Sequence, residues 1–294
     1  MIRVISPGLF TTVQDLGRHG YAHLGVSPAG AADPLSFRIG NRLVGNHDNA
    51  PALEVTLQGG RYEFECDATV AITGAAFDKA PMWHAVNVAK GTIVDIGAAV
   101  TGARGYLCVR GGIDAARIMG SASTHILSGF GAVLKRGDTL RIGNETEGPA
   151  LTRVVLPPEQ RKRLRVTSAA QTHEFDARQA VALVTSSYQV TEDSNRMGLR
   201  LKSGVPLHPP HEGQMLSEGV ALGALQVPPA GEPIILFVDA QTTGGYPVIA
   251  SVITADLASV GQLRPRDRIT FEFVSFGEAR RLLLEQEAFI HAIR

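Results

Sequence analysis

Glycine and proline interrupt this chain at short intervals along its whole length. The 294 residues include 32 glycines and 16 prolines, the residue types that most often end regular elements and form turns. Many of the short segments between them are rich in Val, Ile and Phe, which favours strands over helices. The sequence therefore predicts a mostly β protein with helices as accessories.

Individual segments carry this pattern clearly. Two helices are predicted. One covers 34–43, with Asp33 as N-cap and Pro34 at the first helical position. The other covers 278–293, with an apolar stripe made of Leu282, Leu283, Phe289 and Ile293. The predicted strands are 61–64, 69–73, 91–96, 105–110, 139–142, 181–185, 234–238 and 268–274.

Three sequence motifs recur in the same order in both halves of the chain. The first motif places Asp15, Arg18 and Gly20 against Asp193, Arg196 and Gly198. The second is an apolar strand leading to a Gly-Gly pair, at 106–112 and 234–245, and the third matches 134–142 with 263–271. Three collinear matches indicate a duplicated β domain. We expect a first domain over 1–155 and a second over 156–294, with a ligand cleft between them.

Charge and composition exclude several function classes. Lys plus Arg and Asp plus Glu are equal at 28 each, so no overall field attracts nucleic acid or acidic membrane. The run 161–165 is dense in cations and is interpreted as a solvated inter-domain linker. No signal peptide or membrane-spanning run is recognisable, and Cys66 and Cys108 are interpreted as buried free thiols. A cytoplasmic protein is expected.

The segment 217–247 carries the strongest indication of function. An apolar run, 234–238, ends abruptly at Asp239 and is followed by a glycine-containing polar loop. A buried strand that delivers a carboxylate, an amide and hydroxyls to such a loop can hold a small polar ligand. The alternative is a polar turn that only closes a barrel. The loop residues are Gln241, Thr242, Thr243, Gly244, Gly245, Tyr246 and Pro247.

At these residues the chain resembles a bacterial family. The family comprises allophanate hydrolase subunit 2, the C subunit of 5-oxoprolinase and the Kip-inhibitor antagonist, and it is itself similar to part of the carboxyltransferase domain of urea carboxylase. The resemblance extends over almost the full length. Its motifs are 11–18 (TTVQDLGR), 41–46 (NRLVGN), 54–57 (EVTL), 72–75 (ITGA), 110–113 (RGGI), 193–198 (DSNRMG), 217–220 (SEGV) and 239–247 (DAQTTGGYP).

The resemblance implies two tandem cyclophilin-like β-barrel domains and one of three functions. The first is a subunit of an ATP-dependent 5-oxoprolinase, which converts 5-oxoproline to glutamate only together with a subunit-B-like partner and a subunit-A-like protein. The second is a carboxyltransferase component that acts on urea or a related amide with carboxybiotin. The third is a non-catalytic antagonist of a kinase inhibitor. Polar loop residues favour the catalytic functions, because a sequestering surface needs large apolar anchors.

An amide substrate suggests roles for the loop residues. Asp239 can accept the substrate N–H, and Gln241 or Gln226 can donate to its carbonyl, so Asp239 and Gln241 are the predicted catalytic residues. Substrate contacts are predicted for Gln226, Thr242, Thr243, Gly244, Gly245 and Tyr246. Asp239 has an alternative role as a strand-end cap. Asp15–Arg18 and Asp193–Arg196 are either functional or structural ion pairs.

Other chemistry is not predicted for this chain by itself. The sequence contains no P-loop for ATP and no lysine in a biotin-carrier setting, so ATP belongs to the complex and any biotin to a partner. His208 and His211 are separated by prolines and are not interpreted as metal ligands. The chain departs from the family at Ala122, where an arginine is usual, and at Ala169-Ala170-Gln171, where Gly-Pro-Gln is usual.

Overall fold

The computed structural model describes residues 1–293, which divide into two compact units. Unit 1 comprises Met1–Arg18, Ala29–Glu159 and the chain from Phe289 onward. Unit 2 comprises His19–Pro28 and Gln160–Ala288. The early segment in unit 2 is held there in part by Ser27, whose buried hydroxyl donates to the Val238 carbonyl at 2.9 Å.

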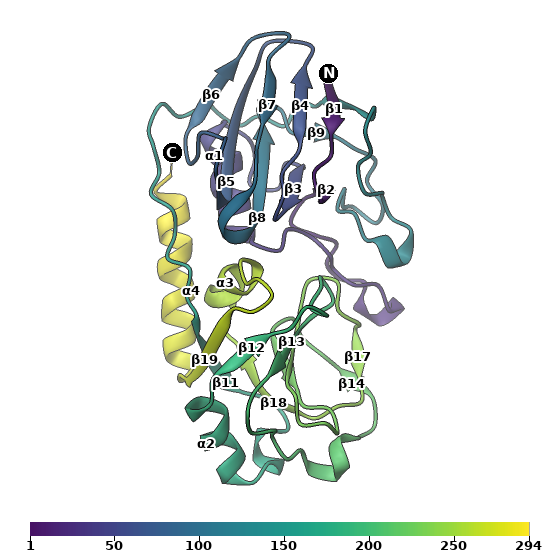
Figure 1. The fold of residues 1–294 in the computed structure, drawn as a ribbon, viewed down its shortest axis with the longest axis vertical. Coiled ribbons are helices and arrows are strands. Elements are labelled where there is room, and N and C mark those ends of the chain that lie inside the picture. The colour runs from purple at the N-terminus through teal and green to yellow at the C-terminus, as the bar shows by residue number, and fades with distance from the viewer. Residues whose placement is uncertain (294) are drawn as a thin grey trace. The chain divides into compact units, whose positions relative to one another are not determined.

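In the described residues, unit 1 is built from two five-stranded sheets (Figure 1). Its strands are β1 (Ile2–Ser6), β2 (Phe10–Gln14), β3 (Ala52–Thr56), β4 (Arg61–Phe64), β5 (Ala68–Phe77), β6 (Ala85–Val88), β7 (Ile93–Asp95), β8 (Ala99–Val109), β9 (Ile113–Asp114) and β10 (Thr139–Ile142). One sheet has the order β7-β4-β1-β10-β9 and the other β2-β3-β8-β5-β6. Every pairing in them is antiparallel.

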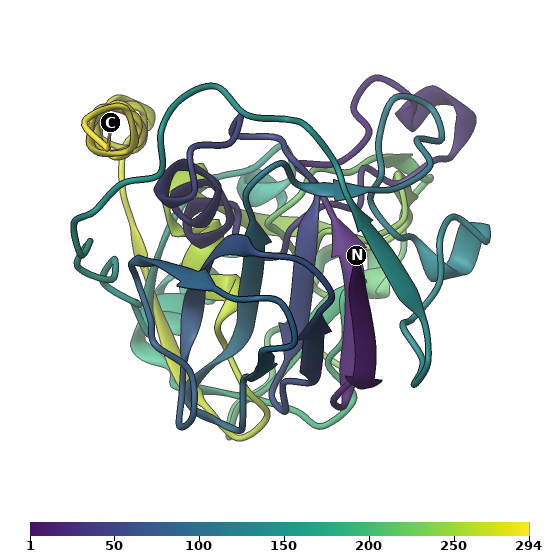
Figure 2. The ribbon, with the colours of Figure 1, turned by 90° about the horizontal axis from the view of Figure 1, so that it is seen from above.

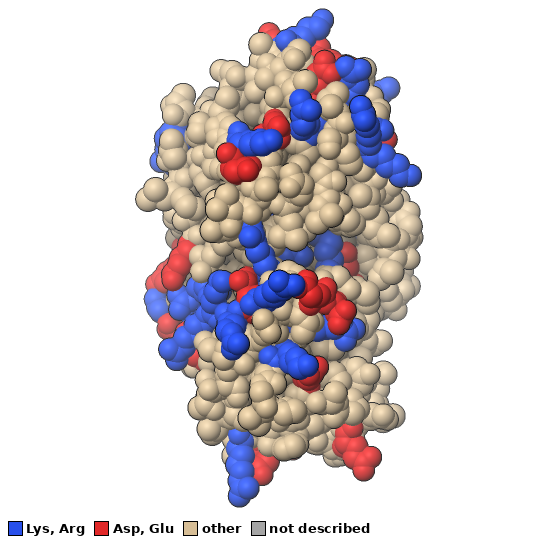
Figure 3. Space-filling model, in the orientation of Figure 1, with Lys and Arg blue, Asp and Glu red and all other residues tan. Residues whose placement is uncertain are grey.

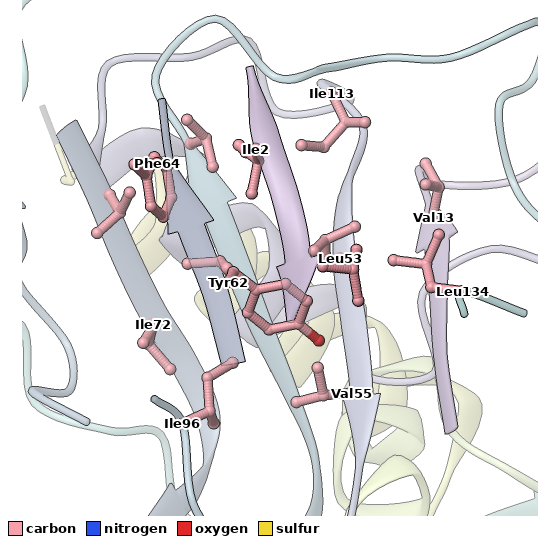
Figure 4. Close-up of a cluster of buried hydrophobic side chains, with 14 of the residues drawn as sticks. Ile2, Val13, Leu53, Val55, Tyr62, Phe64, Ile72, Ile96, Ile113 and Leu134 are labelled. Atoms are coloured by element: carbon pink, nitrogen blue, oxygen red, sulfur yellow. The ribbon is translucent and has the colours of Figure 1, made fainter. Parts of the chain in front are cut away.

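The core of unit 1 lies between the inward faces of these sheets. Figure 4 shows side chains from both sheets pointing toward one another, among them Ile2 and Tyr62 from one and Leu53 and Val55 from the other. Burial of such apolar area supplies most of the folding free energy. It also raises the pKa of Tyr62 to about 12, because the phenolate would be desolvated.

Helix α1 (Pro34–Leu43) packs on β5 and β8 (Figure 2). The Asp33 carboxylate accepts from Ser36 N at 2.9 Å and Pro34 occupies the first turn, so the predicted helix and its cap are confirmed. Gly40 allows the close approach, because a Cβ there would lie 2.7 Å from Cys108 Sγ. Burial raises the pKa of the Cys108 thiol, while Cys66 is only half-buried, contrary to expectation.

Unit 2 contains a closed barrel within the described residues. Its strands are β11 (Arg163–Ser168), β12 (Tyr188–Val190), β13 (Gly198–Lys202), β15 (Ala224–Gln226), β16 (Ile234–Leu236), β18 (Val248–Val252) and β19 (Arg268–Phe273). The order is β11-β18-β15-β16-β13-β12-β19, closed by a parallel β11–β19 pairing. A separate two-stranded sheet pairs β14 (Glu218–Gly219) with β17 (Thr243–Gly244). The mostly β prediction is confirmed.

The remaining helices differ from the sequence-based predictions in two places, at 181–185 and in the apolar stripe of the last helix. They are α2 (Ala177–Thr185), α3 (Leu257–Gly261), α4 (Phe276–His291) and the 3-10 turns η1 (Ala22–Leu24), η2 (Ile126–Ser128), η3 (Thr172–Glu174), η4 (Pro210–Gly213) and η5 (Thr254–Asp256). The strand predicted over 181–185 is wrong: it is the end of α2, whose N-cap Asp176 accepts from Arg178 N at 2.8 Å. In α4, Ile290 is buried while the predicted Phe289 is 43% exposed.

No helix of residues 1–293 combines the length and the apolar character that crossing a membrane requires. Charged side chains of both signs are intermixed on the face shown in Figure 3. The basic run at 161–165 is not a linker, since it enters β11. Its cations pair with acids of unit 2, as Lys162 does with Asp267 at 2.6 Å and Arg163 with Glu272 at 3.0 Å.

The duplicated motifs do not share one strand order. β1 pairs antiparallel with β10, whereas the corresponding β11 and β19 pair in parallel. Asp15 is fully buried, while its counterpart Asp193 is exposed. The third motif does recur as a turn, because Asp138 accepts from Lys135 N at 2.7 Å and Asp267 from Arg264 N at 2.9 Å. The repeat is thus local and does not extend to the order of strands.

Candidate functional site

The two ends of the segment 217–247 meet in unit 2. β14 and β17 pair antiparallel, with Glu218 opposite Gly244 and Gly219 opposite Thr243. Met215 N donates to Gly245 O at 2.9 Å and Val220 N to Thr242 O at 3.0 Å, which extends the pairing beyond the ladder. The polar loop therefore forms one strand of a two-stranded flap, made of β14 and β17, instead of a free turn.

A cavity of about 150 Å³ lies beside this flap. An apolar cavity of about this volume accommodates one benzene molecule, so a small monocyclic ligand fits. Residues from the loop after β11, from β15, from β18 and from the flap enclose it. Its lining consists of Ala169, Ala170, Gln171, Met215, Glu218, Gly219, Val220, Ala221, Ala224, Gly244, Tyr246, Val248 and Ser251.

Gln171 supplies the fixed polar group of the cavity. It is 7% exposed, and its Nε2 donates to Glu218 Oε2 at 2.9 Å. Its Oε1 accepts from Val248 N at 3.4 Å. These two contacts set which end of the carboxamide faces the flap, and each carboxamide nitrogen has two hydrogens to donate. Gln171 and Glu218 thus form a donor–acceptor pair at the cavity wall.

The side-chain carboxamide of Gln226 forms hydrogen bonds with two residues of the loop. It is 1% exposed, its Nε2 donates to Tyr246 O at 3.4 Å, and its Oε1 accepts from Gln241 Nε2 at 3.3 Å. The backbone of Gly244 packs directly against it, since a Cβ at Gly244 would lie 2.3 Å from Gln226 Nε2. An alanine at position 244 would therefore displace the Gln226 carboxamide, and Gln226 and Gln241 connect the loop to β15.

Asp239 is engaged by a guanidinium. Arg196 Nε donates to Asp239 Oδ2 at 2.8 Å and Arg196 Nη2 to Oδ1 at 3.0 Å, a bidentate pair. Both side chains are about nine-tenths buried, and Asp239 N also donates to Arg196 O at 2.8 Å. The predicted Asp193–Arg196 pair is wrong, because Asp193 is exposed and Arg196 pairs with Asp239. Such a buried pair fixes the loop at the end of β16.

The structure brings only part of the predicted residue set to the cavity. Gly244 and Tyr246 line it. The lining described above does not include Asp239, Gln226, Gln241, Thr242, Thr243 or Gly245. Gln171 and Glu218 were not predicted as site residues, although Glu218 lies in a segment that carries the family resemblance and Gln171 lies where the chain departs from the family pattern. Their proximity depends on a contact between positions 47 residues apart, which no local spacing signals.

Asp15 in unit 1 forms a second buried polar cluster. Its carboxylate accepts from Ser121 Oγ at 2.6 Å and from Ala122 N at 2.7 Å, and Arg117 Nη1 lies 3.6 Å away. Arg18 donates to a backbone carbonyl of the same segment, and its guanidinium lies over the Phe130 ring. Each of these contacts is internal, so the cluster supports a structural function for Asp15.

Of the two histidines that were not interpreted as metal ligands, His211 contacts a carboxylate. His211 Nε2 lies 3.0 Å from Glu174 Oε2. Within residues 1–293, no group of three or more His, Cys, Asp or Glu side chains has an arrangement that would hold a metal ion.

Residues 24–273 match the family model described as carboxyltransferase domain, subdomain A and B. The C subunit of 5-oxoprolinase from Escherichia coli (strain K12) is 38% identical over 303 residues, which cover 100% of this chain and 97% of that protein. The same subunit of Haemophilus influenzae is 36% identical, with 100% and 98% covered. The crystal structure of K. lactis urea amidolyase superposes with a TM-score of 0.89 at 31% identity, and this chain spans 20% of it.

Proposed function

The chain belongs to the carboxyltransferase domain family, subdomain A and B, and on this basis we propose that it acts as the C subunit of a 5-oxoprolinase complex. One observation carries the proposal: the similarity to the C subunits of two bacterial 5-oxoprolinases extends from end to end of the proteins. The urea amidolyase match also covers this whole chain, but it corresponds to a fifth of that larger protein. Coverage of 97% and 98% of those C subunits favours the 5-oxoprolinase function.

In the proposed reaction, the lactam C–N bond of 5-oxoproline breaks and water supplies the new carboxylate oxygen of glutamate. The unit 2 cavity is the proposed binding site for the lactam on this chain. Its volume suits a five-membered ring, and its Gln171–Glu218 pair offers both a donor and an acceptor to an amide. The roles predicted for Asp239 and Gln241 stay predictions, and their contacts favour positioning of the loop over contact with substrate.

ATP is assigned to the partner subunits in this proposal. The sequence contains no P-loop, and the glycine pair after β8 does not fit a phosphate cradle. Gly111 N donates to Asn46 Oδ1 at 2.7 Å and Gly112 N to Val109 O at 2.8 Å, so both backbone donors are used internally. A subunit-B-like partner and a subunit-A-like protein would bring the nucleotide chemistry, and the complex would work in the cytoplasm, where ATP is available.

A second candidate function is a carboxyltransferase component acting on urea or a related amide. The TM-score of 0.89 with urea amidolyase favours it, because the fold of this chain is kept in that protein. Any carboxybiotin would come from a partner, since no lysine of this chain lies in a carrier setting. The antagonist function receives less support from the cavity, which binding to a protein partner would not need.

Complementation tests the proposal. An Escherichia coli K12 strain that lacks the C subunit of its own 5-oxoprolinase is given this chain, first alone and then together with its cognate partner subunits, and growth with 5-oxoproline as nitrogen source is measured. Restored growth is expected. If the chain is expressed and folded in that strain together with its cognate partners and growth does not return, the 5-oxoprolinase assignment is wrong. Urea-dependent growth under the same conditions would favour the second candidate.

A further inference from the structure

Resting on the function proposed above, we infer that this chain recognises only the neutral amide part of its substrate, and that a cation on a partner subunit binds the substrate's carboxylate. 5-Oxoproline is a five-membered lactam that carries an ionised carboxylate at neutral pH. The lactam and the carboxylate require different groups in a binding site. The lactam needs a paired donor and acceptor, whereas the carboxylate needs a cation or several N–H donors.

The cavity meets the first demand. The Glu218 carboxylate can accept the lactam N–H, and the second hydrogen of Gln171 Nε2 can be donated to the lactam carbonyl. The 2.9 Å contact between the two side chains keeps donor and acceptor adjacent, as the N–H and C=O of a lactam are. Ala169, Ala224 and Val248 provide apolar walls for the ring methylenes.

The cavity does not meet the second demand. Among the described residues that line it there is no Lys, Arg or His, and Glu218 is the carboxylate that borders it. An anionic ligand would therefore lie close to a like charge without a countercharge among the described lining residues. Arg196, the cation that pairs in bidentate fashion with Asp239 of the loop, is not among the lining residues.

The preference of the cavity for a neutral over an anionic lactam can be measured by comparing two ligands. The neutral lactam 2-pyrrolidinone has the ring of 5-oxoproline without its carboxylate. Kd values for both are determined on the isolated full-length chain by ligand titration followed by NMR. We expect 2-pyrrolidinone to bind about fivefold more tightly than 5-oxoproline, because Glu218 repels the ligand carboxylate but is itself exposed to water, which weakens the repulsion. Tighter binding of the anion, or no binding of the neutral lactam up to its solubility limit, would overturn the inference.

Substitution of Glu218 provides the matched test. Glu218→Gln removes the charge and keeps an acceptor, so the preference for the neutral lactam should fall by about fivefold. Glu212→Gln is the control, because Glu212 is an exposed glutamate of the same unit that does not line the cavity. Both variants are first checked for an unchanged melting temperature. A preference that Glu218→Gln leaves unchanged would contradict the inference.

The assembled complex separates this inference from the proposed function. In the complex, 5-oxoproline should bind more tightly than 2-pyrrolidinone, because the partner's cation is then present. A complex that hydrolyses 5-oxoproline, combined with an isolated chain that already prefers the anion, would overturn the inference and leave the function intact. A complex without hydrolysis would overturn the function and the assignment of the carboxylate to a partner, while a preference of the isolated cavity for neutral amides would stand.

Discussion

The Arg196–Asp239 pair has consequences that a free loop carboxylate would not have. Each side chain is about 10% exposed, so removal of either leaves the other charge poorly solvated. Loss of one partner of a buried pair typically costs about 3–5 kcal/mol in free energy of unfolding. We predict that Asp239→Ala lowers the free energy of unfolding by about 3 kcal/mol, measured by urea denaturation.

The control for Asp239 is Asp193, an aspartate of the same unit. Asp193 is exposed, and Asp193→Ala should change the free energy of unfolding by less than about 0.5 kcal/mol. Equal stability of the two variants would show that the ion pair contributes nothing. A stable Asp239→Ala variant whose complex has lost activity would instead restore the catalytic function predicted from the sequence.

Gly244 gives the second prediction at the residue scale. Gly244→Ala would place a Cβ 2.3 Å from Gln226 Nε2, which is buried and bonded to the loop. Overpacking of this kind typically costs about 1–3 kcal/mol. The urea midpoint should therefore fall, and 2-pyrrolidinone binding should weaken because Gly244 lines the cavity.

Gly219 is the matched glycine for this test. It lies on β14, opposite Thr243, and a Cβ there would have no atom within 4 Å. Gly219→Ala should therefore leave the urea midpoint nearly unchanged. If both alanine variants are equally stable, Gln226 does not hold the loop in the way its contacts indicate.

At the scale of elements, α1 and the end of α4 are joined through arginines. Asp48 Oδ1 accepts from Arg42 Nε at 2.5 Å, Asp48 Oδ2 accepts from Arg38 Nε at 3.0 Å, and Arg42 Nη1 donates to Ile290 O at 2.7 Å. Burial alone would raise the pKa of Asp48, but the hydrogen bonds and charges of Arg42 and Arg38 outweigh it and lower this pKa. The ionised form of Asp48 therefore supports the contact between α1 and the end of α4, which Arg42 makes.

The lowered pKa of Asp48 predicts that its contribution to the free energy of unfolding depends on pH. A carboxyl group whose pKa is lower in the folded state stabilises fully above its unfolded pKa of about 3.9 and loses that contribution as pH falls through the folded pKa. We predict that Asp48→Asn is less stable than the parent at pH 7 and that the difference shrinks below about pH 3.9. Urea denaturation at both pH values measures it, with Asp193→Asn as an exposed control. A difference independent of pH would contradict the assignment.

Local signals explain which elements were predicted correctly. The cap of α1 needs only Asp33 and Pro34, and the turns before β10 and β19 need only the aspartate that closes each. The segment 181–185 has a composition that suits a strand or a helix, and the Asp176 cap that decides for α2 lies upstream of it. In the second of the two turns, Arg266 adopts a left-handed φ of 73°, where the first has Gly137.

Long-range contacts explain what could not be predicted. Strand order depends on pairings between distant segments, and the parallel β11–β19 pairing has no counterpart among the described residues of unit 1. The sequence located the candidate segment at 217–247 and named Gly244 and Tyr246, which do line the cavity. Gln171 was missed because its partner Glu218 is 47 positions away, and the pairing of Asp239 was missed because Arg196 is 43 positions away.

At the scale of the whole molecule, we expect this chain to be one necessary part of a hydrolase that is inactive without its partners. The most direct measurement is glutamate formation from 5-oxoproline and ATP by purified components, with each subunit omitted in turn. We predict turnover by the complete complex, none by this chain alone, and none when this chain is left out. Robust turnover by the isolated chain, or full turnover by the partners without it, would contradict the proposed function.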